Sequence, residues 1–225
     1  FQDWGVTRLN ANGSRDGTFT PASVPFGILA VASQPDGKVL MGGNFVSING
    51  TNRSGIARLE ANGNLDSSFD PGTGIFGYPG GVHAITVQPD GKVLIGGGFT
   101  AFNGTQRGGL ARLHANGSLD DTFDPGTGFS SPNSVYTFSI ALQPDGKMLV
   151  AGTFPGFNGN NRNGIARLNA NGSLDLSFNP GAGVADAPSS YYGVGVKSVV
   201  MQPDGKVLIG GDFNTVNGAN RIGIA

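Results

Sequence analysis

The sequence predicts an all-β fold that repeats one four-stranded unit of about 55 residues. Three observations support this prediction. Three short motifs recur in the same order along the chain, short apolar runs alternate with turn signals rich in glycine and proline, and no segment shows a helical period of useful length.

The repeat is defined by motifs that keep step with one another. Gln-Pro-Asp-Gly-Lys recurs at spacings of 54, 55 and 59 residues, beginning at Gln34, Gln88, Gln143 and Gln202. Arg-Leu-x-Ala-Asn-Gly begins at Arg8, Arg58, Arg112 and Arg167. Asp-x-x-Phe begins at Asp16, Asp66, Asp120 and Asp175. Because the three motifs advance together, they mark one unit that has been copied.

The first two strands of each unit flank the Pro-Asp-Gly turn. The first strand is an apolar run such as Ala84–Val87 or Ser139–Leu142. The turn is expected to be tight, because proline presets φ and glycine accepts positive φ. The second strand, Lys92–Gly97 and its equivalents, is rich in Val, Leu and Ile, which favour strands.

Two Asn-Gly turns organise the second half of each unit. The first leads to the third strand, Gly55–Glu60 and its equivalents, and begins at Asn49, Asn103, Asn158 and Asn217. The second begins at Asn12, Asn62, Asn116 and Asn171. A short fourth strand is expected after it, ending at Phe19, Phe69, Phe123 or Phe178.

Four antiparallel strands in such a unit are typical of a β-propeller blade, so we expect β-propeller blades with four blade equivalents. Glycines at the end of the second strand, such as Gly42, Gly43 and Gly96, are expected where inner strands converge on a central channel. A β-helix would have coils nearer about 20 residues, and a β-sandwich would not need near-identical units.

The organisation of the chain ends leaves two arrangements open. The end units are partial, and the five units run approximately over residues 1–27, 28–82, 83–136, 137–195 and 196–225. Gly5-Val6-Thr7 and Gly223-Ile224-Ala225 both align with the start of the third strand. The chain is therefore expected to be a single propeller or part of a larger propeller or repeat array.

Composition narrows the function. The net charge is −1 and no basic block occurs, so no nucleic-acid partner is expected. The sequence contains no run of about 18 apolar residues, so membrane insertion is not expected. The absence of cysteine excludes disulfides, thiolate metal sites and a cysteine nucleophile. No cofactor or metal is expected, because one Asp per Pro-Asp-Gly turn lacks the several oxygens of a calcium site.

The ordered motifs resemble a known family. The series Gln-Pro-Asp-Gly-Lys-Val-Leu-Ile-Gly-Gly, Asn-Gly, Arg-Leu-x-Ala-Asn-Gly and Asp-x-x-Phe-Asp-Pro-Gly-Thr-Gly resembles the delta-60 repeat over essentially the whole chain. The resemblance implies a propeller-type domain of unknown function in an extracellular, cell-surface or secreted bacterial protein. It brings no catalytic residues. The first copy departs from the pattern, since Arg15 stands where later copies have Leu65, Leu119 and Leu174.

Residues present in every copy are interpreted as serving the blade. Strand arginines and the following aspartates recur in phase, which predicts three structural charge pairs: Arg58 with Asp66, Arg112 with Asp120, and Arg167 with Asp175. The alternative is a ring of ligand-binding arginines. The two histidines, His83 and His114, belong to no metal-type or catalytic cluster.

Residues that differ between copies are free to serve a partner. The loops 73–82, 127–136 and 182–195 vary in length and carry aromatic side chains, which are predicted to contact a ligand: Tyr78, Tyr136, Tyr191, Tyr192, Phe76 and Phe129. The alternative is that these aromatics fill gaps between blades.

The favoured function is therefore a non-enzymatic binding or adhesion module of an extracellular bacterial protein, which recognises a glycan or a protein through its inter-blade loops. The alternative is a purely structural scaffold, spacer or filament subunit, whose partners are other copies or neighbouring domains. A propeller enzyme is the weakest reading, because no convergent acid and base groups occur outside the repeat pattern.

Overall fold

The computed structural model describes residues 5–21, 27–77, 80–129, 135–185 and 193–225. Within these ranges the secondary structure consists of strands and turns and contains no helix. The predicted all-β class is therefore confirmed for the described residues. None of those residues forms a helix with the length and apolar character needed to span a membrane.

Three units each contain an antiparallel sheet in which the second strand lies in the middle. The first sheet has the order β1-β2-β5, and its strands are Ile28–Ser33, Val39–Gly43 and Ile56–Leu59. The second has the order β7-β8-β11, with Gly80–Val87, Val93–Gly98 and Leu110–Leu113. The third has the order β12-β13-β16, with Thr137–Leu142, Met148–Gly152 and Ile165–Leu168.

The last unit repeats only the first half of this sheet. Its strands β18 (Gly195–Met201) and β19 (Val207–Asp212) pair with each other, and a single bridge joins Gly210 to Ile224 at the start of a third strand. At the other end of the chain, residues 5–21 form a small hairpin closed by a bridge between Leu9 and Arg15. That hairpin corresponds to the second half of a unit.

The expected fourth strand is much shorter than predicted. It consists of one bridge per unit, which pairs Leu59 with Leu65, Leu113 with Leu119, and Leu168 with Leu174. The Asp-x-x-Phe segment that follows is a turn, in which the Asp66 carboxylate accepts hydrogen bonds from the Ser68 backbone N–H and hydroxyl. Such side-chain bonds compete with strand pairing, so the chain turns before Phe69 instead of extending to it.

Small hairpins surround the first Asn-Gly turn of every unit. Asn49, Asn103, Asn158 and Asn217 have positive φ values of 46 to 50°, as the tight turn requires. The hairpin strands are β3 (Ser47–Ile48), β4 (Thr51–Asn52), β9 (Ala101–Phe102), β10 (Thr105–Gln106), β14 (Gly156–Phe157), β15 (Asn160–Asn161), β20 (Thr215–Val216) and β21 (Ala219–Asn220). Two further strands, β6 (Ile75–Phe76) and β17 (Val184–Ala185), leave one unit and pair with the hairpin of the next.

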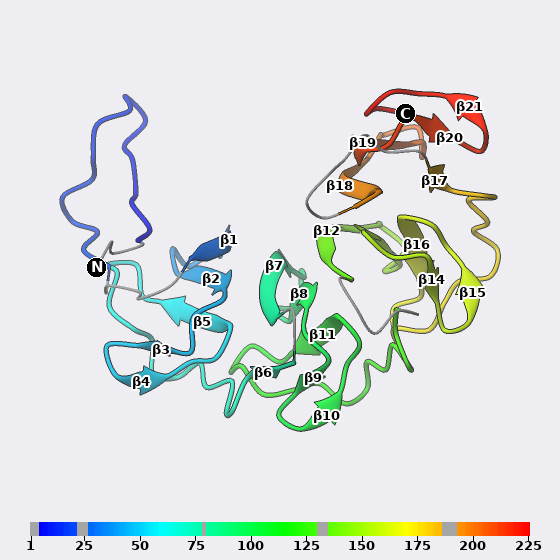
Figure 1. Cartoon of the computed structure of the whole chain (residues 1–225). Helices are drawn as coiled ribbons and strands as arrows, with labels where there is room; N and C mark the ends of the chain where they lie inside the picture. The colour runs from blue at the N-terminus through cyan, green and yellow to red at the C-terminus, as the bar shows by residue number, and fades with distance from the viewer. Residues whose placement is uncertain (1–4, 22–26, 78–79, 130–134, 186–192) are drawn as a thin grey trace.

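The units stand side by side in an arc (Figure 1), with β1, β7, β12 and β18 along its inner side. The hydrophobic core lies between successive sheets. One cluster combines Leu40 and Phe69 of one unit with Val82 and Ile95 of the next. The arc is open in Figure 1, with the N-terminal hairpin and β18–β21 on opposite sides of the gap. Ring closure and blade number therefore stay predictions.

The strand glycines lie where close neighbours leave no room for a side chain, as expected. Gly42 touches the next unit, since a Cβ there would lie 2.6 Å from Val82 Cγ1. Gly97 faces its own unit, since a Cβ there would collide with the backbone carbonyl oxygen of Gly81. Sheet packing and the close path of the first strand exclude larger side chains, and the central channel stays a prediction.

We predict that Gly97→Ala destabilises the fold by roughly 1–3 kcal/mol, because the backbone at Gly81 must move to admit a methyl group. Gly210→Ala is the matched control, because its Cβ would meet only Gly223 O at 3.7 Å. Urea unfolding of both variants measures the difference. Equal stability of the two variants would contradict this account of Gly97.

Candidate functional site

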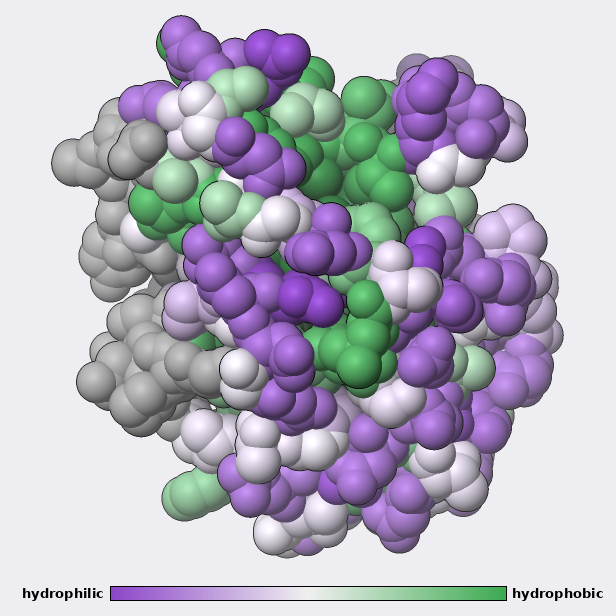
Figure 2. Space-filling view, turned by 90° about the vertical axis from the view of Figure 1, so that its right-hand side faces the viewer, coloured by the Kyte–Doolittle hydropathy of each residue, from purple (hydrophilic) through white to green (hydrophobic). Residues whose placement is uncertain are grey.

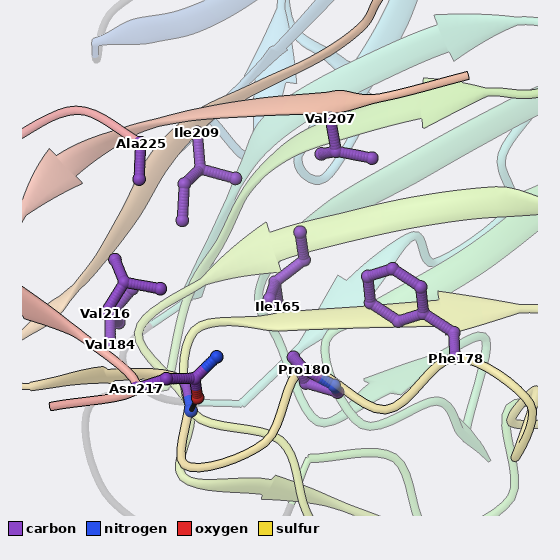
Figure 3. A pocket seen from close by; sticks show the side chains of 10 residues that line it. Ile165, Phe178, Pro180, Val184, Val207, Ile209, Val216, Asn217 and Ala225 are labelled. Atoms are coloured by element: carbon purple, nitrogen blue, oxygen red, sulfur yellow. Dashed lines mark hydrogen bonds between the residues drawn. The ribbon is translucent and has the colours of Figure 1, made fainter. Parts of the chain in front are cut away.

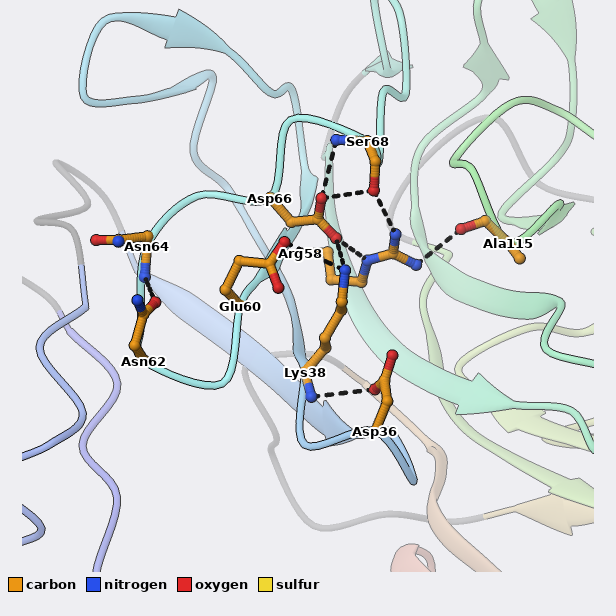
Figure 4. A network of polar contacts seen from close by, with 9 residues as sticks. All are labelled: Asp36, Lys38, Arg58, Glu60, Asn62, Asn64, Asp66, Ser68 and Ala115. Carbon is orange, nitrogen blue, oxygen red and sulfur yellow. Dashed lines mark hydrogen bonds and ion pairs between the residues drawn. The ribbon is translucent and has the colours of Figure 1, made fainter.

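The recurrent charged residues form a buried network (Figure 4). In the first complete unit Arg58 Nε donates to Asp66 Oδ2 at 2.7 Å, and Lys38 Nζ donates to the same oxygen at 2.8 Å. The other Asp66 oxygen accepts the Ser68 hydroxyl. The carboxylate is thus held from three sides, with its side chain 2% exposed.

The predicted pairs are present in the other two units. Arg112 contacts Asp120 at 2.7 Å and Arg167 contacts Asp175 at 2.8 Å. The lysine of the Pro-Asp-Gly-Lys turn again joins each pair, as Lys92 and Lys147. Sequence reasoning did not include this lysine, although it recurs in every copy of the turn motif.

The same arginines connect neighbouring units. Nη1 of Arg58 donates to the backbone oxygen of Ala115 at 2.7 Å, and Nη1 of Arg112 donates to that of Ala170 at 2.7 Å. The Arg58 guanidinium also lies over the Phe69 ring, 5.0 Å from its centroid. With these contacts made inside the structure, the arrangement favours a structural role over a ring of ligand-binding arginines.

The network keeps its carboxylates ionised. Burial opposes ionisation of Asp66, but hydrogen bonds from Lys38, Ser68 and Arg58 outweigh it and hold the pKa well below its ordinary range. Burial of Asp120 is outweighed in the same way by Thr122, Lys92 and Arg112, so its pKa is also strongly lowered. Hydrogen bonds from Lys147 and Ser177 lower the pKa of Asp175.

A second set of residues differs from copy to copy at one backbone position. In every unit the register between the first and second strands shifts near the start of the first strand, as at a β-bulge. The residues at the shift are Leu29, His83, Phe138 and Lys197. Bulges re-aim a side chain and are common beside binding sites. A distortion that recurs from unit to unit therefore carries a different residue each time, on strands that line the inner side of the arc.

Three of these side chains gather with Tyr136. The His83 ring lies 5.1 Å from that of Tyr136 and 5.4 Å from that of Phe138, both edge-on. Tyr136 stacks on Phe138 at 5.6 Å. Lys197 Nζ lies 3.9 Å from the centroid of Phe138 and 3.6 Å from Asp212 Oδ2. We call His83, Tyr136, Phe138, Lys197 and Asp212 the bulge cluster.

The bulge cluster borders an open pocket of about 350 Å³, which β1, β7 and β12 line with Leu29, His83, Phe138 and their neighbours. Burial and the nearby Lys197 charge lower the pKa of His83 to about 4, so its imidazole is neutral at pH 7. Burial also lowers the pKa of Lys197, and Asp212 opposes that effect. The cluster therefore combines aromatic rings, a neutral imidazole and one ion pair.

The predicted ligand-binding aromatics do not form one group. Tyr136 belongs to the bulge cluster, whereas Phe76 lies on β6 and is 75% exposed. Phe129 is buried between units, stacked on Phe154 at 4.2 Å and edge-on to Phe157. Phe129 thus fills an inter-blade gap, as the alternative interpretation holds, and its assignment to a ligand surface was wrong. Tyr78, Tyr191 and Tyr192 lie outside the described residues.

Sequence reasoning also missed a set of side-chain hydrogen bonds that joins neighbouring units. Asn103 Oδ1 accepts hydrogen bonds from the Thr73 hydroxyl and the Gly74 N–H of the preceding unit, and Asn158 does the same for Thr127 and Gly128. The Asn-Gly pair had been read as a turn alone. The sequence signal for this contact was that a Pro-Gly-Thr-Gly segment recurs in the unit before each of these two Asn-Gly pairs.

Within the described ranges, no three His, Asp or Glu side chains gather as potential metal ligands.

Comparison with known proteins gives one family. A family model described as a domain of unknown function (DUF5122) beta-propeller matches residues 1–19, 34–69, 88–123, 143–178 and 202–225. This description does not contain the name delta-60 repeat, so that finer resemblance stays a prediction. No curated protein matches the chain.

One similar solved structure is the extracellular domain of a B. thetaiotaomicron protein, BT4673, described as a one component system. It is 14% identical, with a TM-score of 0.47. The match covers 88% of this chain and 21% of that one, so this chain spans about a fifth of its length.

We predict that Asp120→Ala costs about 3–5 kcal/mol, because it leaves Arg112 and Lys92 without their buried carboxylate. Asp121→Ala is the matched control. The Asp121 side chain is 81% exposed and pairs with Arg107 at 3.2 Å, so its loss should cost less than about 1 kcal/mol. Urea unfolding compares the two, and similar losses would rule out a special role for the network.

We also predict that stability falls in acid. In the folded chain the pKa values of Asp66, Asp120 and Asp175 are lowered, whereas in the unfolded chain they return to about 3.9. The stabilisation is therefore present above about pH 4 and is lost as pH falls towards the folded pKa values. Unfolding free energies from pH 7 to pH 3 measure this, and Asp120→Asn should flatten the curve.

Proposed function

The chain belongs to the DUF5122 β-propeller family, and from that premise we propose that it is a non-enzymatic binding module whose ligand site is the bulge cluster. The observation that carries the proposal is the bulge itself. The same backbone distortion recurs in the four units that have a first strand, yet a different residue stands at it in each. A position that serves only the structure of the blade is expected to keep the same residue type in every unit, as the position of Arg58, Arg112 and Arg167 does.

The chemistry of the cluster suits a glycan. Half-buried aromatic rings offer apolar faces and edges to a sugar, and a few placed polar groups fix its orientation. Tyr136 and Phe138 supply the rings, and the Lys197–Asp212 pair supplies a donor and an acceptor. The neutral His83 adds a hydrogen-bonding group without a charge. A protein ligand is the alternative outcome of the test below.

The setting forms part of the same proposal. We place this module in an extracellular bacterial protein, as the resemblance of its repeat motifs implies, and we expect the site to act in recognition or adhesion.

A second candidate function is a structural scaffold. It is favoured by the bonds that run from each unit to the next, such as Arg58 to Ala115 and Asn103 to Gly74. These contacts give a stiff repeat array whether or not the array binds a ligand.

We predict that the chain binds glycans on an array and that Phe138→Ala weakens the binding by more than about 1 kcal/mol. Leu176→Ala is the matched control, since Leu176 is an exposed apolar side chain that belongs neither to the cluster nor to the predicted ligand contacts. Calorimetry with the best array ligand measures both variants, and melting curves check their folds. A blank array would favour the scaffold, and equal effects of the two changes would remove the bulge cluster as the site.

A further inference from the structure

We propose that the unit of residues 137–195 carries an open carboxylate-binding site at Arg162, which takes an aspartate or glutamate side chain of a polypeptide partner. In the two preceding units the equivalent arginine is paired with an aspartate of its own unit. In this unit, both repeat positions that supply such an aspartate hold uncharged residues.

The site lies apart from the bulge cluster. Arg162 directly follows β15, and the hairpin β14–β15 lies on the outer side of the arc in Figure 1. The strands β7, β12 and β18, which carry most of the bulge cluster, lie along the inner side. A partner at Arg162 therefore does not compete with a ligand at the bulge cluster.

The arginine after the small hairpin takes the same pose in three successive units. In Arg53, Arg107 and Arg162, Nη1 donates to the backbone oxygen of the preceding residue at 2.7–2.9 Å. The three residues are also equally buried, with exposed fractions of 6–7%. Differences between them therefore come from the side chains around the guanidinium.

In the first two of these units a carboxylate reaches the guanidinium from the solvent side. Arg53 Nη1 lies 3.5 Å from Asp70 Oδ1, and Arg107 Nη2 lies 3.2 Å from Asp121 Oδ1. The Asp70 side chain is 68% exposed and that of Asp121 is 81% exposed. A carboxylate of another molecule can approach this edge of the guanidinium by the same route.

Arg162 has no such carboxylate. Asn179 stands at the repeat position of Asp70, and Leu176 stands at that of Asp121. Across the described ranges, Arg162 forms no ion pair, and its side chain makes one hydrogen bond, from Nη1 to Asn161 O. A buried cation is costly without an anion beside it, so this arginine favours a carboxylate supplied from outside the chain.

Asn179 adds a second donor to the site. Its Oδ1 accepts the Gly181 N–H at 3.0 Å, as Asp70 Oδ1 accepts the Gly72 N–H at 3.0 Å. This bond orients the amide and leaves Nδ2 as a donor. By repeat position Asn179 lies beside Arg162 as Asp70 lies beside Arg53, so the two oxygens of one carboxylate can accept from both groups.

The following unit does not decide whether the site is open. Arg53 and Arg107 are each followed by a complete unit, yet their side chains bond only to residues of their own units. Asp70 and Asp121 also stay exposed with those following units in place. The difference at Arg162 therefore comes from the residue types within its own unit.

The backbone at Asn179 is anchored on both sides. Phe178 and Pro180 line an apolar pocket together with Ile165 and Val184, and Figure 3 shows these side chains around it. Asn179 does not line this pocket and is exposed. Its apolar neighbours thus fix the turn, while the amide stays accessible to a partner.

The surface beside the site favours a polypeptide over a sugar acid. Leu176 is 69% exposed. Figure 2 faces the side on which β14, β15 and β17 lie in Figure 1, and it shows a mainly hydrophilic surface with hydrophobic side chains among it. An apolar side chain next to the acidic residue of a polypeptide can cover Leu176, whereas a sugar acid would place hydroxyl groups there.

The first experiment follows the arginine Nε–H resonances of the 225-residue chain by NMR while acetyl-Leu-Asp-Leu amide is added. The Arg162 resonance should shift and saturate in the millimolar range, as expected of a single charge-assisted contact. Arg53 and Arg107 are internal controls, because each already has an aspartate. Acetyl-Leu-Asn-Leu amide, which has no carboxylate, should bind Arg162 at least about tenfold more weakly.

Two isosteric exchanges then close the site and open another. Asn179→Asp supplies the carboxylate that Arg53 has, so the peptide should bind Arg162 at least about tenfold more weakly. Asp70→Asn removes that carboxylate from the first complete unit, where Ser67 offers none at the other position, so Arg53 should begin to respond. Melting curves check that both variants remain folded.

Four results would overturn the proposal. No response of Arg162 up to about 50 mM peptide would show that the site is not open. Equal responses to the two peptides would show that the carboxylate is not recognised, and unchanged binding in Asn179→Asp would place the peptide elsewhere. Glucuronate that binds as tightly as the acidic peptide would identify a sugar acid as the ligand. The readout is the Arg162 resonance, so glycan binding at the bulge cluster is tested separately by Phe138→Ala.

Discussion

In two of the complete units, one guanidinium group, that of Arg58 or Arg112, holds together four parts of this fold. Arg58 bonds to Asp66 and so fixes the third strand to the turn that follows it. Lys38 of the Pro-Asp-Gly-Lys turn donates to the same Asp66 oxygen, which joins that turn to the pair. The Arg58 guanidinium also covers the Phe69 ring and donates to the backbone oxygen of Ala115 in the next unit. A buried charge of this kind is costly unless it is fully paired. The sheet, its two turns and its neighbour must therefore be in place together, and the regular spacing of the arc follows from that requirement.

The repeat made much of this fold predictable from the sequence. Proline, aspartate and glycine fixed the turns, and the apolar runs between them became the first three strands within a few residues, as Ser139–Leu142 became β12. The Arg58–Asp66 pair could be predicted because a strand arginine flanked by apolar residues needs a partner. These inferences depend on local chemistry that every copy repeats, so each copy supported the reading of the others.

The features that sequence reasoning missed depend on contacts between units. The role of Asn103 is visible only once Gly74 of the preceding unit lies beside it, and the burial of Phe129 depends on Phe154 of the following unit. The fourth strand failed as a prediction because Ser68 and Asp66 bond to each other, and the Asp-x-Ser or Asp-x-Thr pattern that recurs in every copy was the sequence signal of this turn. The bulge cluster was hidden because a register shift leaves no residue signature. His83 looked isolated until three strands placed it beside Tyr136 and Phe138.

The bond from Arg58 to Ala115 has a direction, since the donor always belongs to the earlier unit and the acceptor to the later one. The array therefore has polarity in the sense that a microfilament does, with one end that offers carbonyls and one that offers guanidinium donors. Each unit carries both halves of the bond, so a duplicated gene segment encodes a unit that fits between any two others. Lengthening such a protein needs no newly invented contact. Natural variation can then act on unit number and on the single bulge residue separately, because neither constrains the other.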